Sequence, residues 1–129
     1  MFERLVSIIG RSTLKDTTGA SKESIVSAEE KLGVKFSDEY KALISNMGAC
    51  IYKGHEIVGI CKYPYLNVVD VTLEAREFNP IVPKNLYVVE NTHFDSIYIW
   101  QDESGTVYQT YPNCKPKRIA DSLSEYLEL

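Results

Sequence analysis

The chain has 129 residues, of which 44% are hydrophobic and 25% charged, and this balance is typical of a globular protein of one domain. Its formal net charge of −4 argues against a nucleic-acid binder, which usually needs a clustered basic surface, and suits a basic partner. The sequence shows neither a secretory signal pattern nor an apolar run near the ~18 residues that span a bilayer. Cys50, Cys61 and Cys114 form no CxxC pair, so we expect reduced thiols, a cytoplasmic location and no membrane association.

Helical periodicity dominates the first part of the chain. Residues Phe2–Ile9 have apolar side chains at helical spacing and predict a short helix, whereas Arg11–Ala20 shows no period and predicts a loop. Ser21–Gly33 and Ser37–Gly48 each begin with a serine cap, continue as an amphipathic helix and end at a glycine. Because only three residues separate them, we predict a tight helical hairpin.

The middle of the chain changes from helical to strand periodicity and back again. Residues Ala49–Ile60 surround a Gly-His turn with Ile, Tyr and Val and predict two short strands. Residues Val69–Phe78 predict a further helix, with Asp70 as a candidate cap and Asn79-Pro80 as its end.

Strand signals and one last helix follow. The predicted strands are Leu86–Glu90, Ser96–Gln101 and Thr106–Tyr111, and the turn Asp102–Gly105 joins the last two as an antiparallel hairpin. A closing helix is predicted from the apolar spacing of Ala120, Leu123 and Leu127 and from the capping-box spacing of Ser122 and Glu125. The order of these elements predicts a single α+β domain over residues 1–129, with an antiparallel sheet flanked by helices.

The run Ile25–Ile44 resembles the opening signature of the SUKH superfamily, the Smi/Knr-like domain. That signature is a helix ending in Glu and Leu-Gly, followed by an acidic pair and Tyr-Lys on the next helix. Phe36-Ser37 stands here in place of the usual Leu-Pro, and Met47-Gly48 in place of Asn-Gly. The residues that match the family landmarks are Glu30, Leu32, Gly33, Tyr40, Gly48, Thr72 and Arg76.

The resemblance implies a binding function. Bacterial members of this family are typically immunity proteins that neutralise toxins, often nucleases, whereas fungal relatives regulate cell-wall signalling. We therefore expect an immunity protein that binds a cognate toxin, with a regulatory scaffold as the alternative. Thr72 and Arg76 lie one helical turn apart, where the arginine can bind a carboxylate of the sheet or of a partner, or serve as an internal anchor.

Signatures of catalysis are scarce in the sequence. There is no GxGxxG, phosphate-binding loop, HExxH or GxSxG motif. His55 and His93 remain as candidates for an acid–base pair, and Cys50 with His55 for a thiol–imidazole pair, although two loop histidines are the simpler interpretation. The sequence thus predicts a non-enzymatic protein without catalytic residues, metal or cofactor.

Aromatic residues of the later strands indicate where a partner binds. In Ser96–Gln101, Tyr98 and Trp100 alternate with two isoleucines. If the isoleucines face the helices, the aromatic side chains lie on an open face of the sheet, beside Tyr108 across the hairpin. Core packing and a solvated charged surface are the competing interpretations. The predicted partner-binding residues are Tyr98, Trp100 and Tyr108 at the centre, with Asp102 and Glu103 as an acidic rim for a basic toxin.

Overall fold

The computed structural model describes residues 14–15 and 19–129, and this part of the chain has the α+β fold that the sequence predicts. Its strands are β1 (Leu14–Lys15), β2 (Cys50–Tyr52), β3 (His55–Ile57), β4 (Tyr87–Asn91), β5 (Tyr98–Gln101), β6 (Val107–Thr110) and β7 (Lys117–Ala120). Its helices are α2 (Lys22–Leu32), α3 (Asp38–Asn46), the 3-10 helix η1 (Pro64–Leu66), α4 (Val68–Phe78) and α5 (Leu123–Leu127).

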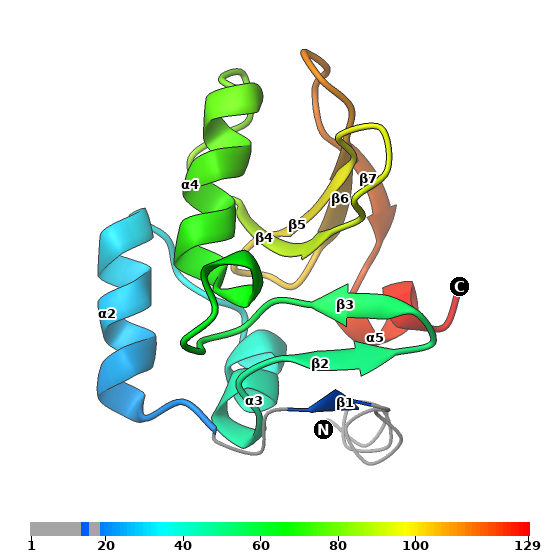
Figure 1. Cartoon of the computed structure of the whole chain (residues 1–129). Coiled ribbons are helices and arrows are strands. Elements are labelled where there is room, and N and C mark those ends of the chain that lie inside the picture. Colours follow the sequence, from blue (N-terminus) through cyan, green and yellow to red (C-terminus); the bar gives the residue numbers. More distant parts are fainter. Residues whose placement is uncertain (1–13, 16–18) are drawn as a thin grey trace.

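The sheet is an antiparallel meander in which every strand pairs with the next strand in the sequence. The order is β1-β2-β3-β4-β5-β6-β7, and Figure 1 shows the β2–β3 hairpin beside the more strongly curved β4–β7 part. A bulge between Val88 and Glu90 shifts the register against β5. Gly105, at φ 100°, provides the conformation that the β5–β6 turn requires and most residues avoid.

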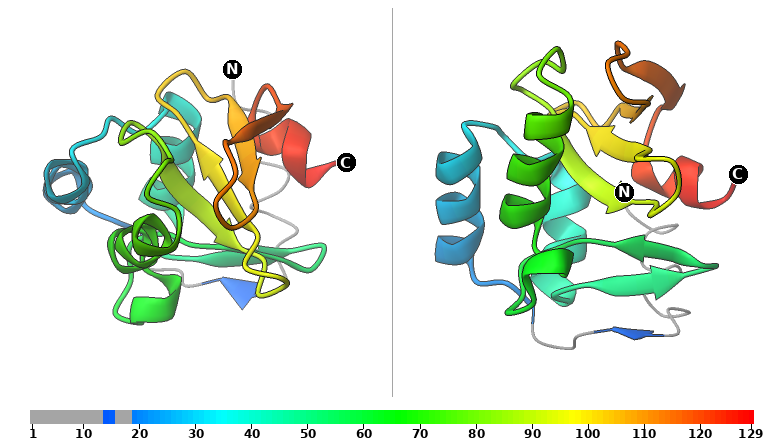
Figure 2. Two further views of the ribbon diagram at one scale, coloured as in Figure 1. Left: turned by 90° about the horizontal axis from the view of Figure 1, so that it is seen from above. Right: turned by 45° about the horizontal axis from the view of Figure 1, so that its top comes forward.

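Local capping explains why α2 and α3 begin and end where the sequence predicts. Ser21 accepts a hydrogen bond from the Ser24 amide at 3.1 Å, and Gly33 ends α2 in the left-handed conformation. Ser37 caps α3 in the same way through the Tyr40 amide at 3.0 Å. The two predicted helices are therefore confirmed, but α2 packs mainly against α4 and not against α3, as the predicted hairpin required (Figures 1 and 2).

Helices cover both faces of the central strands, whereas the sequence analysis left one face of the sheet open. On one face, Thr72 of α4 accepts a hydrogen bond from the Val88 amide of β4 at 3.0 Å. On the other, Tyr87 and Gln101 point toward α3, where the Gln101 side chain accepts hydrogen bonds from the Tyr87 hydroxyl at 2.8 Å and the Ser37 hydroxyl at 3.0 Å. The view from above in Figure 2 shows α4 and α5 on opposite sides of the strands.

A buried carboxylate, Glu39 of α3, holds the last helix in place. Its Oε1 accepts hydrogen bonds from the Leu123 amide at 2.7 Å and from the Gln101 side chain at 3.2 Å. Its Oε2 accepts hydrogen bonds from the Ser124 amide at 3.0 Å and from the Ser124 hydroxyl at 2.7 Å. Since Ser122 accepts from the Glu125 amide at 3.0 Å, the first three amides of α5 all have acceptors.

Several boundaries differ from the sequence predictions. Leu14–Lys15, predicted as part of a loop, pairs with β2 as strand β1. Asn67 caps α4 in place of Asp70, because its side chain accepts from the Val69 amide at 3.0 Å. Ala120, assigned to the closing helix, ends strand β7, which the sequence analysis missed. The helix predicted over Phe2–Ile9 lies outside the described residues.

Candidate partner-binding surface

The aromatic side chains predicted on an open sheet face are buried. Tyr98 is 4% exposed and Trp100 is fully buried, and the Trp100 indole donates to the Thr110 hydroxyl at 2.8 Å. Helix α4 lies on this face, and burial together with Glu74 of that helix raises the pKa of Tyr98. The prediction that Tyr98 and Trp100 are exposed is therefore wrong, because the strand is covered on both faces.

The rest of the predicted site is accessible at the β5–β6 turn. The Tyr108 hydroxyl donates to Asp102 Oδ2 at 3.0 Å, and Asp102 Oδ1 accepts from the Thr106 amide at 3.1 Å and the Ser104 hydroxyl at 2.6 Å. Partial burial, and then the Asp102 carboxylate, raise the pKa of Tyr108. Asp102 thus stabilises the turn, and Glu103 is the exposed acidic residue beside it.

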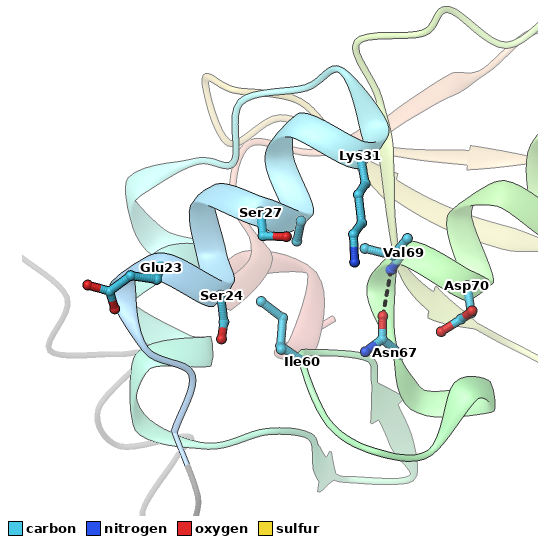
Figure 3. Close-up of a pocket in the computed structure, with 9 residues that line it drawn as sticks. Glu23, Ser24, Ser27, Lys31, Ile60, Asn67, Val69 and Asp70 are labelled. Carbon is cyan, nitrogen blue, oxygen red and sulfur yellow. Dashed lines mark hydrogen bonds between the residues drawn. The ribbon is translucent and has the colours of Figure 1, made fainter.

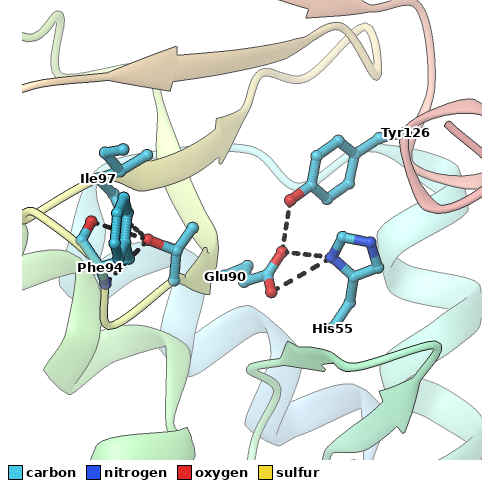
Figure 4. A network of polar contacts seen from close by, with 6 residues as sticks. His55, Glu90, Phe94, Ile97 and Tyr126 are labelled. Carbon is cyan, nitrogen blue, oxygen red and sulfur yellow. Dashed lines mark hydrogen bonds and ion pairs between the residues drawn. The ribbon is translucent and has the colours of Figure 1, made fainter.

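The two candidate histidines, His55 and His93, contact different carboxylates and do not form an acid–base pair with each other. His55 Nδ1 lies 3.0 Å from Glu90 Oε1, which also accepts a hydrogen bond from the Tyr126 hydroxyl at 2.5 Å (Figure 4). His93 lies 3.9 Å from Glu56. Nothing in the sequence pattern indicated that Glu90 and Tyr126 would surround His55, since β4 and α5 are distant in the chain.

The chemistry available to this His55 cluster is limited. Burial, and then the Glu90 carboxylate, raise the pKa of Tyr126, so its hydroxyl is a poor nucleophile. Burial also raises the pKa of the Cys50 thiol to about 11, which keeps the thiol protonated at neutral pH. Within residues 14–15 and 19–129, no group of three His, Cys, Asp or Glu side chains is placed to hold a metal ion, and no helix has the length and apolarity to cross a membrane.

A groove opens between α2 and the beginning of α4. It has a volume of about 430 Å³, and Ala28, Ile60 and Val69 contribute apolar side chains to it. Glu23 and Asp70 line it from the two helices, and Lys31 also contributes to the lining (Figure 3). The sequence analysis did not predict this groove, because α2 and α4 belong to separate predicted elements.

Exposed apolar side chains continue from this groove along η1 and α4. Leu73 is 45%, Phe78 58% and Ile81 51% exposed, and Tyr63 and Tyr65 of the η1 segment are exposed as well. We define the α4 surface as Tyr63, Tyr65, Asp70, Leu73, Glu74, Glu77, Phe78 and Ile81. Leu73 and Phe78 are among the apolar positions that predict the helix Val69–Phe78, and the structure leaves both exposed.

Comparison with known proteins identifies the family to which the chain belongs. The family model described as SUKH_5, SMI1-KNR4 cell-wall, matches residues 2–128. The chain belongs to the SMI1-KNR4 family. A search of curated proteins found no match. Among solved structures, the crystal structure of a protein from Pseudomonas syringae pv. tomato is similar, with a TM-score of 0.77 at 16% identity over 100% of both chains, and this likeness supports the fold.

The family landmarks of this SMI1-KNR4 chain are mainly structural. Leu32 and Tyr40 are buried, and the Tyr40 hydroxyl donates to the Val58 carbonyl at 2.6 Å. Thr72 joins α4 to β4, and one Arg76 nitrogen, Nη2, donates to the carbonyls of Leu32 and Lys84, both at 3.0 Å. Arg76 is thus an internal anchor to backbone carbonyls.

Other SMI1-KNR4 landmarks lie at helix ends and on the surface. Gly33 forms the left-handed cap of α2. Glu30 is exposed on α2, and Gly48 is buried just after α3, where the extended Met47 ends the helix. The signature therefore defines how α2, α3 and α4 are assembled.

Proposed function

We propose that this protein is an immunity protein that binds a cognate protein toxin and blocks its action. The observation that carries the proposal is the family match over residues 2–128, because the bacterial proteins that the sequence resembles typically neutralise toxins. An acidic chain with a net charge of −4 is suited to a basic toxin, such as a nuclease.

The described residues favour binding over catalysis. His55 contacts a carboxylate and a tyrosine whose raised pKa makes it a poor nucleophile. The Cys50 thiol is buried, and its raised pKa keeps it protonated. We therefore propose that the protein acts without turnover, by occupying a surface that the toxin needs.

A regulatory scaffold is the second candidate function. The description of the matching family includes the words "cell-wall", and the fungal proteins that the sequence resembles regulate cell-wall signalling. In that case the same chain recruits a host signalling protein. Its deletion would then alter growth under cell-wall stress and would not sensitise cells to a toxin.

A growth assay tests the proposed function. Each open reading frame directly upstream of this gene in its source genome is expressed from an inducible promoter, with and without the chain. We expect at least one of these products to stop growth, and co-expression of the chain to restore it. A His55→Ala/His93→Ala variant should protect as well as the wild type, since protection depends on binding.

Two outcomes count against the proposal. If no toxic product is relieved, while deletion of the gene changes growth under cell-wall stress, the scaffold function replaces it. If relief is lost in a folded His55→Ala/His93→Ala variant, a catalytic mechanism replaces neutralisation by binding.

A further inference from the structure

Exposed apolar side chains are concentrated in the segment that comprises η1 and α4. In the part of the chain that the structure describes, five of the nine large hydrophobic residues that are exposed fall within residues 63–81, namely Tyr63, Tyr65, Leu73, Phe78 and Ile81. A concentration of this kind on a small protein usually marks an interaction site. The α4 surface is thus the strongest candidate for a protein interface.

The carboxylates of the α4 surface give it a mainly negative charge, with the Lys62 ammonium, 5.3 Å from the centre of the Tyr63 ring, as a neighbouring cation. Asp70, Glu74 and Glu77 follow one another at spacings of four and three residues, which places them on the same face of α4. No described lysine or arginine forms an ion pair with any of the three. Arg76, the only cation within α4, is directed inward to the Leu32 and Lys84 carbonyls.

The neighbouring groove extends this surface with carboxylates and apolar side chains, and Lys31 contributes one cation to its lining. Asp70 belongs to both the groove and the α4 surface, and Glu23 contributes a second carboxylate from α2. Ile60 and Val69 supply apolar contacts between them (Figure 3), and Ala28 also lines the groove. A long basic side chain can pack its aliphatic part there and keep its charge near the carboxylates.

We propose that the α4 surface is the site where the toxin docks, and that the toxin presents lysine and arginine side chains around an apolar centre. This inference rests on the proposed function. A symmetric contact between two copies of the chain would bring the same carboxylates together and is disfavoured by repulsion. The β5–β6 turn fits such a partner less well, because Asp102 and Tyr108 already bind each other and Arg118 lies close enough to Tyr108 to influence its pKa.

Two pairs of matched variants test the docking site. The probe is the toxin domain that the wild-type chain neutralises in the growth assay, purified with an inactivating substitution. Phe78→Ala is compared with Phe94→Ala, since Phe94 is 66% exposed on the β4–β5 loop. Glu77→Lys is compared with Glu103→Lys, which changes the net charge equally at the β5–β6 turn.

We expect Phe78→Ala to raise the Kd at least tenfold through faster dissociation, and Phe94→Ala to leave it within twofold. Glu77→Lys should slow association several-fold at 50 mM salt and much less at 500 mM, because salt screens exposed charges. Circular dichroism confirms that each variant is folded.

The remaining outcomes separate the two proposals. If the wild type neutralises the toxin but Phe78→Ala and Glu77→Lys bind as it does, the α4 surface is not the docking site and the proposed function stands. If Glu103→Lys is the variant that slows association, the β5–β6 turn is the site instead. If the wild type neutralises no toxin, the proposed function fails and this inference fails with it.

Discussion

At the scale of single residues, Glu39 shows how one side chain can connect distant elements. Its carboxylate accepts from the Leu123 amide, the Ser124 amide and hydroxyl, and Gln101. In Glu39→Gln, the amide group replaces one of the accepting oxygens, so buried donors of α5 lose their partner. We expect a loss of about 2 to 4 kcal/mol of unfolding free energy, from missing helix-capping and buried hydrogen bonds. Urea unfolding at pH 7 measures it.

The neighbouring Asp38 provides the control for this substitution. It is exposed in the first turn of α3, where a carboxylate contributes only a few tenths of a kcal/mol through the helix dipole. Asp38→Asn should therefore change the unfolding free energy by about 0.5 kcal/mol or less. Equal effects of the two substitutions would contradict the role assigned to Glu39.

The cysteines should differ in reactivity, because only one of them is exposed. Cys114 lies on the surface, whereas burial raises the pKa of Cys50 to about 11. At pH 8 about one Cys50 thiol in a thousand is then ionised, and only the thiolate reacts. With a disulfide reagent we expect Cys114 to react rapidly and Cys50 only after unfolding in urea. If the folded protein shows a fast phase of reaction with the reagent that persists in Cys114→Ser and disappears in Cys50→Ser, the predicted protection of Cys50 is wrong.

At the scale of elements, α3 contributes its apolar face to the core. Leu43 and Ile44 are almost completely buried, and Ser45 on the same helix is exposed. Leu43→Ala should lower the unfolding free energy by about 2 to 5 kcal/mol, because it removes buried methyl groups and leaves a cavity. Ser45→Ala should change it by about 0.5 kcal/mol or less. Thermal melts of both variants compare them, and an unchanged Tm for Leu43→Ala would remove it from the core.

Helices with local caps were predicted well, and elements that depend on distant partners were not. Ser21, Gly33 and Ser37 act on amides or carbonyls within a few residues, so their effect is visible in the sequence. Strand β1 is two residues long and is defined only by its pairing with β2. Strand β7 begins with exposed Lys117 and Arg118, which gave no apolar alternation to recognise.

The binding surface was harder to predict than the elements, because exposure is set by packing between them. The alternation in β5 correctly places Tyr98 and Trp100 on one face, but it does not show that α4 covers that face. The same limitation applies to Leu73 and Phe78, which look like core residues until α4 is placed on the sheet. Sequence reasoning therefore identified the fold and the family, but two of the three aromatic residues that it placed at the centre of the interface, Tyr98 and Trp100, are buried.

At the scale of the whole molecule, buried tyrosines should make the protein sensitive to alkaline pH. Burial raises the pKa of Tyr40, Tyr87 and Tyr126 above the usual value of 10.0. Above about pH 10 the unfolded chain loses these protons while the folded chain keeps them, so it is the unfolded state that binds fewer protons. The contribution of these tyrosines to the unfolding free energy should be fully present below about pH 10. Above that pH, the unfolding free energy should fall by up to ~1.4 kcal/mol per pH unit for each tyrosine. Urea unfolding between pH 8 and pH 11 measures the slope.

Tyr126→Phe separates the tyrosine contribution from that of the lysines, which also titrate near pH 10. The variant loses its hydrogen bond to Glu90 and should be less stable at pH 8. Above pH 10, however, its unfolding free energy should fall less steeply than that of the wild type. Parallel curves for the two proteins would show that Tyr126 keeps an ordinary pKa in the folded state.

The contact of Glu39 with α5 also has a consequence for the rates of folding and unfolding. The meander pairs strands that follow one another in the chain, whereas Glu39 contacts residues 84 and 85 positions away. Closing so long a loop costs entropy before any contact compensates for it, so we expect α5 to dock after the rate-limiting step. Glu39→Gln should then accelerate unfolding and leave refolding nearly unchanged in stopped-flow urea jumps. The helix that Glu39 holds would thus determine how long the folded protein persists.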